Sequence, residues 1–197
     1  WSNKTKLIDS ITSLPISGGQ NYYFGNYIDA AVDSQRTILT INELGLPLNL
    51  NGSAYGSYVS GTDLYIVGSF SNVDKNSYSD YVVKYDTLTN TWSNLGTNGP
   101  NSYVYAIIGS GSNIYVGGIF NGIAGKYPRY KIGYWSTTNN QWNSIDSISG
   151  IFAGWNSIDC FCFSGSDLYI GGYSTTSNYR NVLKYNTLTD TVSYLGV

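Results

Sequence analysis

The residues that could carry out catalysis are few, because this 197-residue chain contains no histidine. That absence excludes Ser-His-Asp and Cys-His nucleophile systems and any zinc or copper bound by histidine. Two carboxylates could still act as a glycosidase pair, if acids such as Asp29, Asp74 and Asp159 converged on one pocket. We therefore expect no enzyme, metal or cofactor, and keep a hydrolase with its site partly outside this sequence as an alternative.

Most acids have a simpler explanation in turns. At two positions of an internal repeat, aspartate and asparagine replace each other: Asn21, Asp63, Asn113 and Asp167 at one, and Asp86 and Asn186 at the other. A position that accepts either residue uses side-chain hydrogen bonding in a turn and not titration. These acids are therefore expected to be structural.

The two cysteines lie in the apolar run 158–163 and are separated by one residue. In a strand, Cys160 and Cys162 would share one face with Cα atoms ~7 Å apart, at the limit for a disulfide. We expect both to be small buried hydrophobic residues.

The composition describes a globular, β-rich chain. Aromatic residues make up 16% of the sequence and charged residues only 11%, which excludes a disordered tail or a coiled coil. The net charge is −2 and the basic residues form no cluster, so no nucleic-acid partner is expected. No apolar run reaches the roughly 18–20 residues of a membrane helix, so no membrane insertion is expected.

Four segments of the chain match one another when they are aligned on central tyrosines at a period of about fifty residues. These tyrosines are Tyr23, Tyr65, Tyr115 and Tyr169. A second element follows in each unit, most clearly at 81–92, 131–142 and 181–192, with a degenerate copy at 37–48. The period and the turn-rich connections predict an all-β repeat fold.

Each unit is expected to contain four short strands, which in the third unit are 103–108, 113–117, 130–135 and 141–145. Tight turns between them make each sheet an antiparallel meander. Such a sheet cannot bury both faces alone, so successive copies must pack face to face, which predicts a β-propeller. The expected blades are 8–50, 51–96, 101–146 and 156–197.

A glycine pair ends the second strand in units three and four, Gly117-Gly118 and Gly171-Gly172, where neighbouring backbone can approach closely. An aromatic residue and then a tryptophan follow: Tyr134 and Trp142 in unit three, Tyr85 and Trp92 in unit two. This pattern resembles the kelch repeat family, which includes the propeller of galactose-oxidase-like proteins. The resemblance implies a propeller, commonly of six or seven blades. The copper oxidase activity of those relatives is not expected, because its site needs histidine.

Residues 1–7 resemble an outermost strand of a neighbouring blade. Four units with one surplus strand predict part of a larger propeller, and a closed four-bladed ring is the alternative. The bias toward Asn, Tyr, Ile and Ser is typical of an AT-rich genome, which favours a virion or extracellular surface component over a cytoplasmic protein.

The loops between second and third strands are the expected binding face, since they vary between units and carry arginine, lysine and tyrosine. We expect a non-catalytic module for protein binding or self-assembly, with carbohydrate binding through exposed aromatics, notably Trp155, as the alternative. The candidate binding residues are Arg36, Lys75, Tyr78, Lys126, Tyr127, Arg129, Trp155, Tyr179 and Arg180.

Overall fold

The computed structural model describes residues 12–15, 21–24, 51–71, 73, 80–128, 130–174 and 181–195. Nearly all regular structure in these ranges is strand, which confirms the all-β prediction. Strands and helices follow the order β1 (Thr12–Pro15), β2 (Asn21–Phe24), β3 (Ala54–Ser60), β4 (Asp63–Gly68), β5 (Val82–Asp86), β6 (Thr91–Ser93), β7 (Val104–Ser110), β8 (Asn113–Gly118), β9 (Ile132–Ser136), β10 (Gln141–Ser144), α1 (Asp146–Ser149), a 3₁₀ helix (Gly150–Gly154), β11 (Trp155–Ser164), β12 (Asp167–Ser174), β13 (Val182–Asn186) and β14 (Thr191–Tyr194).

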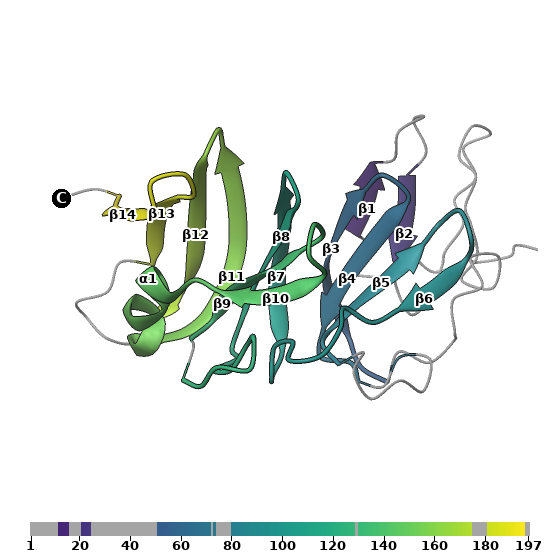
Figure 1. Cartoon of the computed structure of the whole chain (residues 1–197), viewed down its shortest axis with the longest axis horizontal. Helices are drawn as coiled ribbons and strands as arrows, with labels where there is room; N and C mark the ends of the chain where they lie inside the picture. The colour runs from purple at the N-terminus through teal and green to yellow at the C-terminus, as the bar shows by residue number, and fades with distance from the viewer. Residues whose placement is uncertain are drawn as a thin grey trace, which may run out of the picture.

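The strands form three four-stranded antiparallel meanders, as the repeat predicts. They are blade two (β3–β6), blade three (β7–β10) and blade four (β11–β14), and β1 pairs with β2 in a separate hairpin beside β3 (Figure 1). Within each meander every strand pairs with its neighbour in sequence. Short turns join the first strand to the second and the third to the fourth in each blade, which is why the turn signals in the sequence located these strands.

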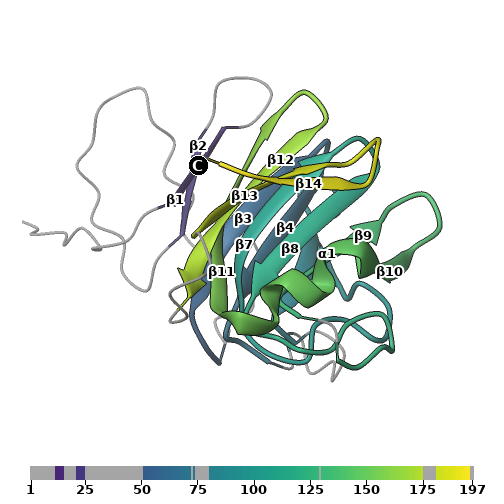
Figure 2. The same ribbon diagram turned by 90° about the vertical axis from the view of Figure 1, so that its left-hand side faces the viewer.

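The blades are arranged as in a β-propeller. The first strands β3, β7 and β11 lie next to one another, and each sheet extends outward from them (Figures 1 and 2). Each blade therefore has a forward face toward the next blade in sequence and a backward face toward the previous one. The first strands are innermost, so their exposed edges lie along the propeller axis.

Two of the predicted turn positions differ in what their acids do. Asp86 Oδ1 accepts hydrogen bonds from the backbone N–H of Leu88 at 2.8 Å and of Thr89 at 2.9 Å, as a turn residue should. Asn186 does the same in blade four, at 3.1 and 3.0 Å. Asp63, by contrast, starts β4 and forms an ion pair with Lys84 at 3.1 Å, so its expected role in a turn is wrong.

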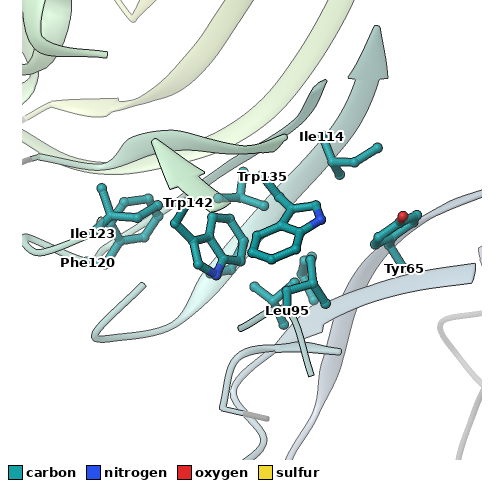
Figure 3. Close-up of a cluster of buried hydrophobic side chains, with 11 residues drawn as sticks. Tyr65, Leu95, Ile114, Phe120, Ile123, Trp135 and Trp142 are labelled. Carbon is teal, nitrogen blue, oxygen red and sulfur yellow. The ribbon is translucent and has the colours of Figure 1, made fainter. Parts of the chain in front are cut away.

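The apolar core lies between blades. Tyr65, Val67, Val82 and Leu95 on the forward face of blade two join one buried cluster with side chains of blade three (Figure 3). Those partners are Val104, Ile114, Val116, Phe120, Ile123, Trp135 and Trp142. The forward face of blade three packs on blade four in the same way, through Tyr115, Ile132 and Ile145. Burying the apolar faces of the sheets in this way stabilises their stacking.

The register of β9 corrects one assignment. Trp135, and not Tyr134, pairs with Trp142, just as Tyr85 pairs with Trp92. Trp135 therefore occupies the tyrosine position of the repeat and contacts Trp142 edge to face at 5.5 Å. Tyr134 lies on the other face, 5.4 Å from Tyr115. Two adjacent aromatic residues made the sequence alignment ambiguous by one position, which in a strand changes the face.

Candidate functional site

Most of the predicted binding residues lie outside the described residues: Arg36, Lys75, Tyr78, Arg129, Tyr179 and Arg180. Two others, Lys126 and Tyr127, lie in the described part of the loop between β8 and β9. The Tyr127 side chain is 72% exposed, and Lys126 Nζ forms an ion pair with Asp146 Oδ2 at 2.8 Å. Because Asp146 belongs to the connection between blades three and four, this pair joins the two kinds of loop at one end of the propeller.

Trp155 was expected in an exposed loop, and this expectation is wrong. It begins β11 and its side chain is only 3% exposed. Phe152, from the preceding 3₁₀ helix, contacts its ring edge to face at 5.0 Å. An aromatic pair that is buried between blades contributes to the core and presents no surface for a sugar.

A small cleft between blades two and three contains an acid and a base. It has a volume of about 230 Å³ and is lined by Asp63, Tyr65, Lys84 and Trp135, among others. Burial, followed by the nearby Asp63 carboxylate, raises the pKa of Tyr65 far above its usual value. Asp63 is paired with Lys84, and the cleft is smaller than the roughly 300–1,000 Å³ of typical ligand pockets. Asp63 and Lys84 belong to neighbouring strands of blade two, so their ion pair links β4 to β5 at the edge of this cleft.

The forward face of blade four is open to solvent. Val182 is 42% exposed, although its counterparts Val82 and Ile132 are 2% and 0% exposed. Leu195 is 43% exposed, although Leu95 and Ile145 are 2% and 5% exposed. We call this the open face of blade four and define it by Cys160, Cys162, Tyr169, Val182 and Leu195.

Both cysteines are free and exposed on this face, so the expectation that they are buried is wrong. Cys160 pairs with Gly171 and Cys162 with Tyr169 across β11 and β12, which places both thiols on the forward side. A side chain in this position is buried only when another blade covers it. The apolar sequence around the cysteines is therefore compatible with burial, but none of the described elements covers the sheet here.

The innermost strands also carry residues that sequence reasoning missed. A register shift lies between Ala54 and Gly56 in β3, between Val104 and Ala106 in β7, and between Ile158 and Cys160 in β11. The residues inside these shifts have no cross-strand partner and are Tyr55, Tyr105 and Asp159. Bulges of this kind re-aim a side chain and are common next to binding sites. The spacing of Tyr55 and Tyr105, one full repeat apart, was the available signal.

These bulged residues interact across blades. The rings of Tyr55 and Tyr105 meet edge to face with centroids 5.3 Å apart, and Tyr55 remains 46% exposed. Burial, and then the neighbouring Tyr55 and Asp159, raise the pKa of the Tyr105 phenol. The neighbouring Tyr103 phenol also raises the pKa of Tyr105, and the Tyr103 ring in turn contacts Tyr81 with centroids 5.8 Å apart. The result is a partly exposed patch of tyrosines with one carboxylate at the innermost strands.

No group of three or more histidine, cysteine or acidic residues comes together in the described ranges as a metal site would require. Among the helices in those ranges, none is both long and apolar enough to cross a membrane.

No protein-family model matches this chain, and no curated protein matches it. Among solved structures, the chain is similar to the computationally designed Ika8 protein, with 13% sequence identity and a TM-score of 0.46. The alignment covers 95% of this chain and 46% of that protein, so the chain spans a little under half of its length. The fold assignment accordingly rests on the strand order and blade packing described above.

Proposed function

We propose that this chain is a non-catalytic assembly module that binds a second copy of itself through the open face of blade four. The observation that carries the proposal is the exposure of Val182 and Leu195 at positions that are buried in both preceding blades. Large apolar side chains that are gathered on one exposed face are typical of interaction sites.

The occupant is inferred from the apolar character that the open face shares with the covered forward faces of blades two and three. The forward faces of blades two and three each bury their side chains against another apolar sheet face. A second copy of the chain carries such a face, because it has the same open face of blade four. Pairing of two identical faces about a two-fold axis buries both and closes the assembly, which is the commonest arrangement in homo-oligomers.

The test is the mass in solution of two matched variants. Val182→Asp places a charge on the open face, whereas Leu188→Asp places the same charge in the turn after β13, where Leu188 is 84% exposed. We expect sedimentation and light scattering to give twice the 21.6 kDa chain mass at high concentration for the wild type and for Leu188→Asp. Val182→Asp should give the mass of one chain. A wild-type protein that stays at one chain mass, or equal dissociation by both variants, contradicts the proposal.

The cysteines provide a second readout of the same face. Cys160 and Cys162 are exposed in a single chain, so a maleimide reagent should label both at low protein concentration. Pairing through the open face should slow this labelling several-fold as concentration rises, and Val182→Asp should remove the protection. Labelling that is fast at every concentration would show that another surface makes the contact.

The kelch affiliation is part of this proposal. It is supported by the glycine pairs and by the aromatic pairs seven residues apart, Tyr85 with Trp92 and Trp135 with Trp142. Rigid propellers of this kind suit binding and assembly. The carbohydrate alternative loses its main residue, because Trp155 is buried.

A further inference from the structure

The tyrosine patch at the innermost strands is distinct from the open face and has its own chemistry. Its central residues, Tyr55, Tyr105 and Asp159, occupy the same bulge position in the first strands of three successive blades. Those strands lie side by side, so the three bulges are brought to adjacent places along the propeller axis. In each strand the bulge leaves one residue without a cross-strand partner and turns its side chain in a new direction. A bulge that recurs at the same position in three strands points to a role beyond packing.

Asp159 gives this patch a negative charge, and the described lysines leave it unpaired. Asp159 is exposed and forms no ion pair with any lysine that the structure describes. Three of those lysines, Lys84, Lys126 and Lys184, are paired with other carboxylates, and the amine of Lys131 donates to the carbonyl of Ile119. The Tyr105 phenol has a raised pKa and stays neutral at physiological pH. Tyr55, Tyr105 and Asp159 therefore offer aromatic rings and a carboxylate that is paired with none of the lysines in the described ranges.

We propose that Tyr55, Tyr105 and Asp159 bind an organic cation, an ammonium or guanidinium group, at the propeller axis. Aromatic faces attract a cation because their π electrons are negative, and the carboxylate supplies a charged hydrogen-bond acceptor. An anionic ligand would be repelled by Asp159, and a purely apolar one would leave that carboxylate without a partner.

The experiment is isothermal titration at low ionic strength with two cationic probes, spermidine and a hexalysine peptide, and with neutral maltohexaose. We expect saturable binding of at least one cation and none of the sugar. Tighter binding of spermidine would identify the ligand as a small free amine. Tighter binding of hexalysine would identify it as a basic segment of a protein. Saturable binding of neither cation overturns the proposal, as does binding of the sugar alone.

Single substitutions distinguish cation binding at this site from diffuse attraction of cations to an acidic protein. Asp159→Asn should weaken cation binding about tenfold or more, and Tyr55→Leu several-fold, because they remove the carboxylate and one aromatic face. Asp86→Asn is the matched control, since it removes the same charge at a turn where blade four naturally has Asn186. It should leave the affinity unchanged. Equal losses for Asp159→Asn and Asp86→Asn would show diffuse attraction and overturn the site. Circular dichroism checks that each variant is folded.

Discussion

At the scale of single residues, one oxygen can decide the shape of a turn. Asp86 Oδ1 accepts two backbone N–H groups in the turn between β5 and β6, and Asn186 Oδ1 makes the same pair of bonds between β13 and β14. These bonds to backbone N–H groups lower the pKa of Asp86. Asn186 carries no charge, and its Nδ2 amide also donates to Ser166 Oγ and Asp167 Oδ1. The two turns are therefore natural versions of an Asp-to-Asn exchange.

This exchange predicts a specific pH dependence of stability. A carboxyl whose pKa is lower in the folded protein than in the unfolded chain stabilises the fold above the unfolded value, 3.8 for Asp86. That contribution is lost as the pH falls below 3.8 through the folded pKa. The difference in unfolding free energy between wild type and Asp86→Asn should thus be constant above about pH 5 and shift against the wild type toward about pH 2. Urea unfolding across this range measures it, and a difference that is independent of pH would contradict the assignment.

At the scale of strands, the glycine that ends the second strand and the bulge in the first strand depend on each other. A Cβ built on Gly118 would lie 2.1 Å from the carbonyl oxygen of Tyr103, next to the bulge in β7. A Cβ on Gly68 would lie 2.0 Å from the carbonyl oxygen of Ser53, and a Cβ on Gly172 would lie 2.2 Å from the carbonyl oxygen of Ser157. At the preceding position the nearest atoms belong to side chains: a Cβ on Gly117 would lie 2.5 Å from Ile158 Cγ2, and one on Gly171 2.5 Å from Cys160 Sγ. Side chains move aside more easily than backbone, which explains why valine can stand at position 67.

The glycine positions therefore differ in their tolerance of a methyl group. Gly118→Ala should destabilise the protein by about 1–3 kcal/mol, because backbone atoms of two strands would have to separate. Gly171→Ala is the control: its Cβ would meet only the Cys160 side chain closely, at 2.5 Å, on the open face, where that side chain has room to move. Chemical denaturation compares the two. A loss of stability at Gly171 as large as that at Gly118 would show that the bulge does not set the requirement.

Whether a feature could be predicted from the sequence depends on whether it is set within a strand and its turns or by a neighbouring element. The four-stranded meanders and the glycine pair follow from local turn chemistry and a period, and both were predicted. The bulges that present Tyr55 and Asp159 were not, because one inserted residue leaves no mark on an apolar pattern. Cys160 and Trp155 were misplaced for another reason: exposure at a blade face depends on the neighbouring element, which local sequence does not specify.

At the scale of the whole molecule, the blades are similar in sequence but unequal in their surroundings. Blade three has apolar clusters on both faces, formed with blades two and four. In the described ranges, blade four has a buried apolar cluster on its backward face, and its forward face contains exposed apolar side chains. In a repeat protein, the stability of each unit is the sum of its own stability and its contacts with neighbours. Blade four should then be the less stable of the two.

Hydrogen exchange tests this inequality directly. Val182 and Leu195 each forgo about 1 kcal/mol of burial relative to their counterparts in blade three, so backbone amides of β12 and β13 should exchange about tenfold faster or more than those of β8 and β9. Amides of β4 and β5 are the control and should behave like blade three, because blade two has buried clusters on both faces. At concentrations where two copies pair, exchange in blade four should slow to match. Equal protection of blades three and four in a single chain would mean that they open only together, and that the open face weakens neither.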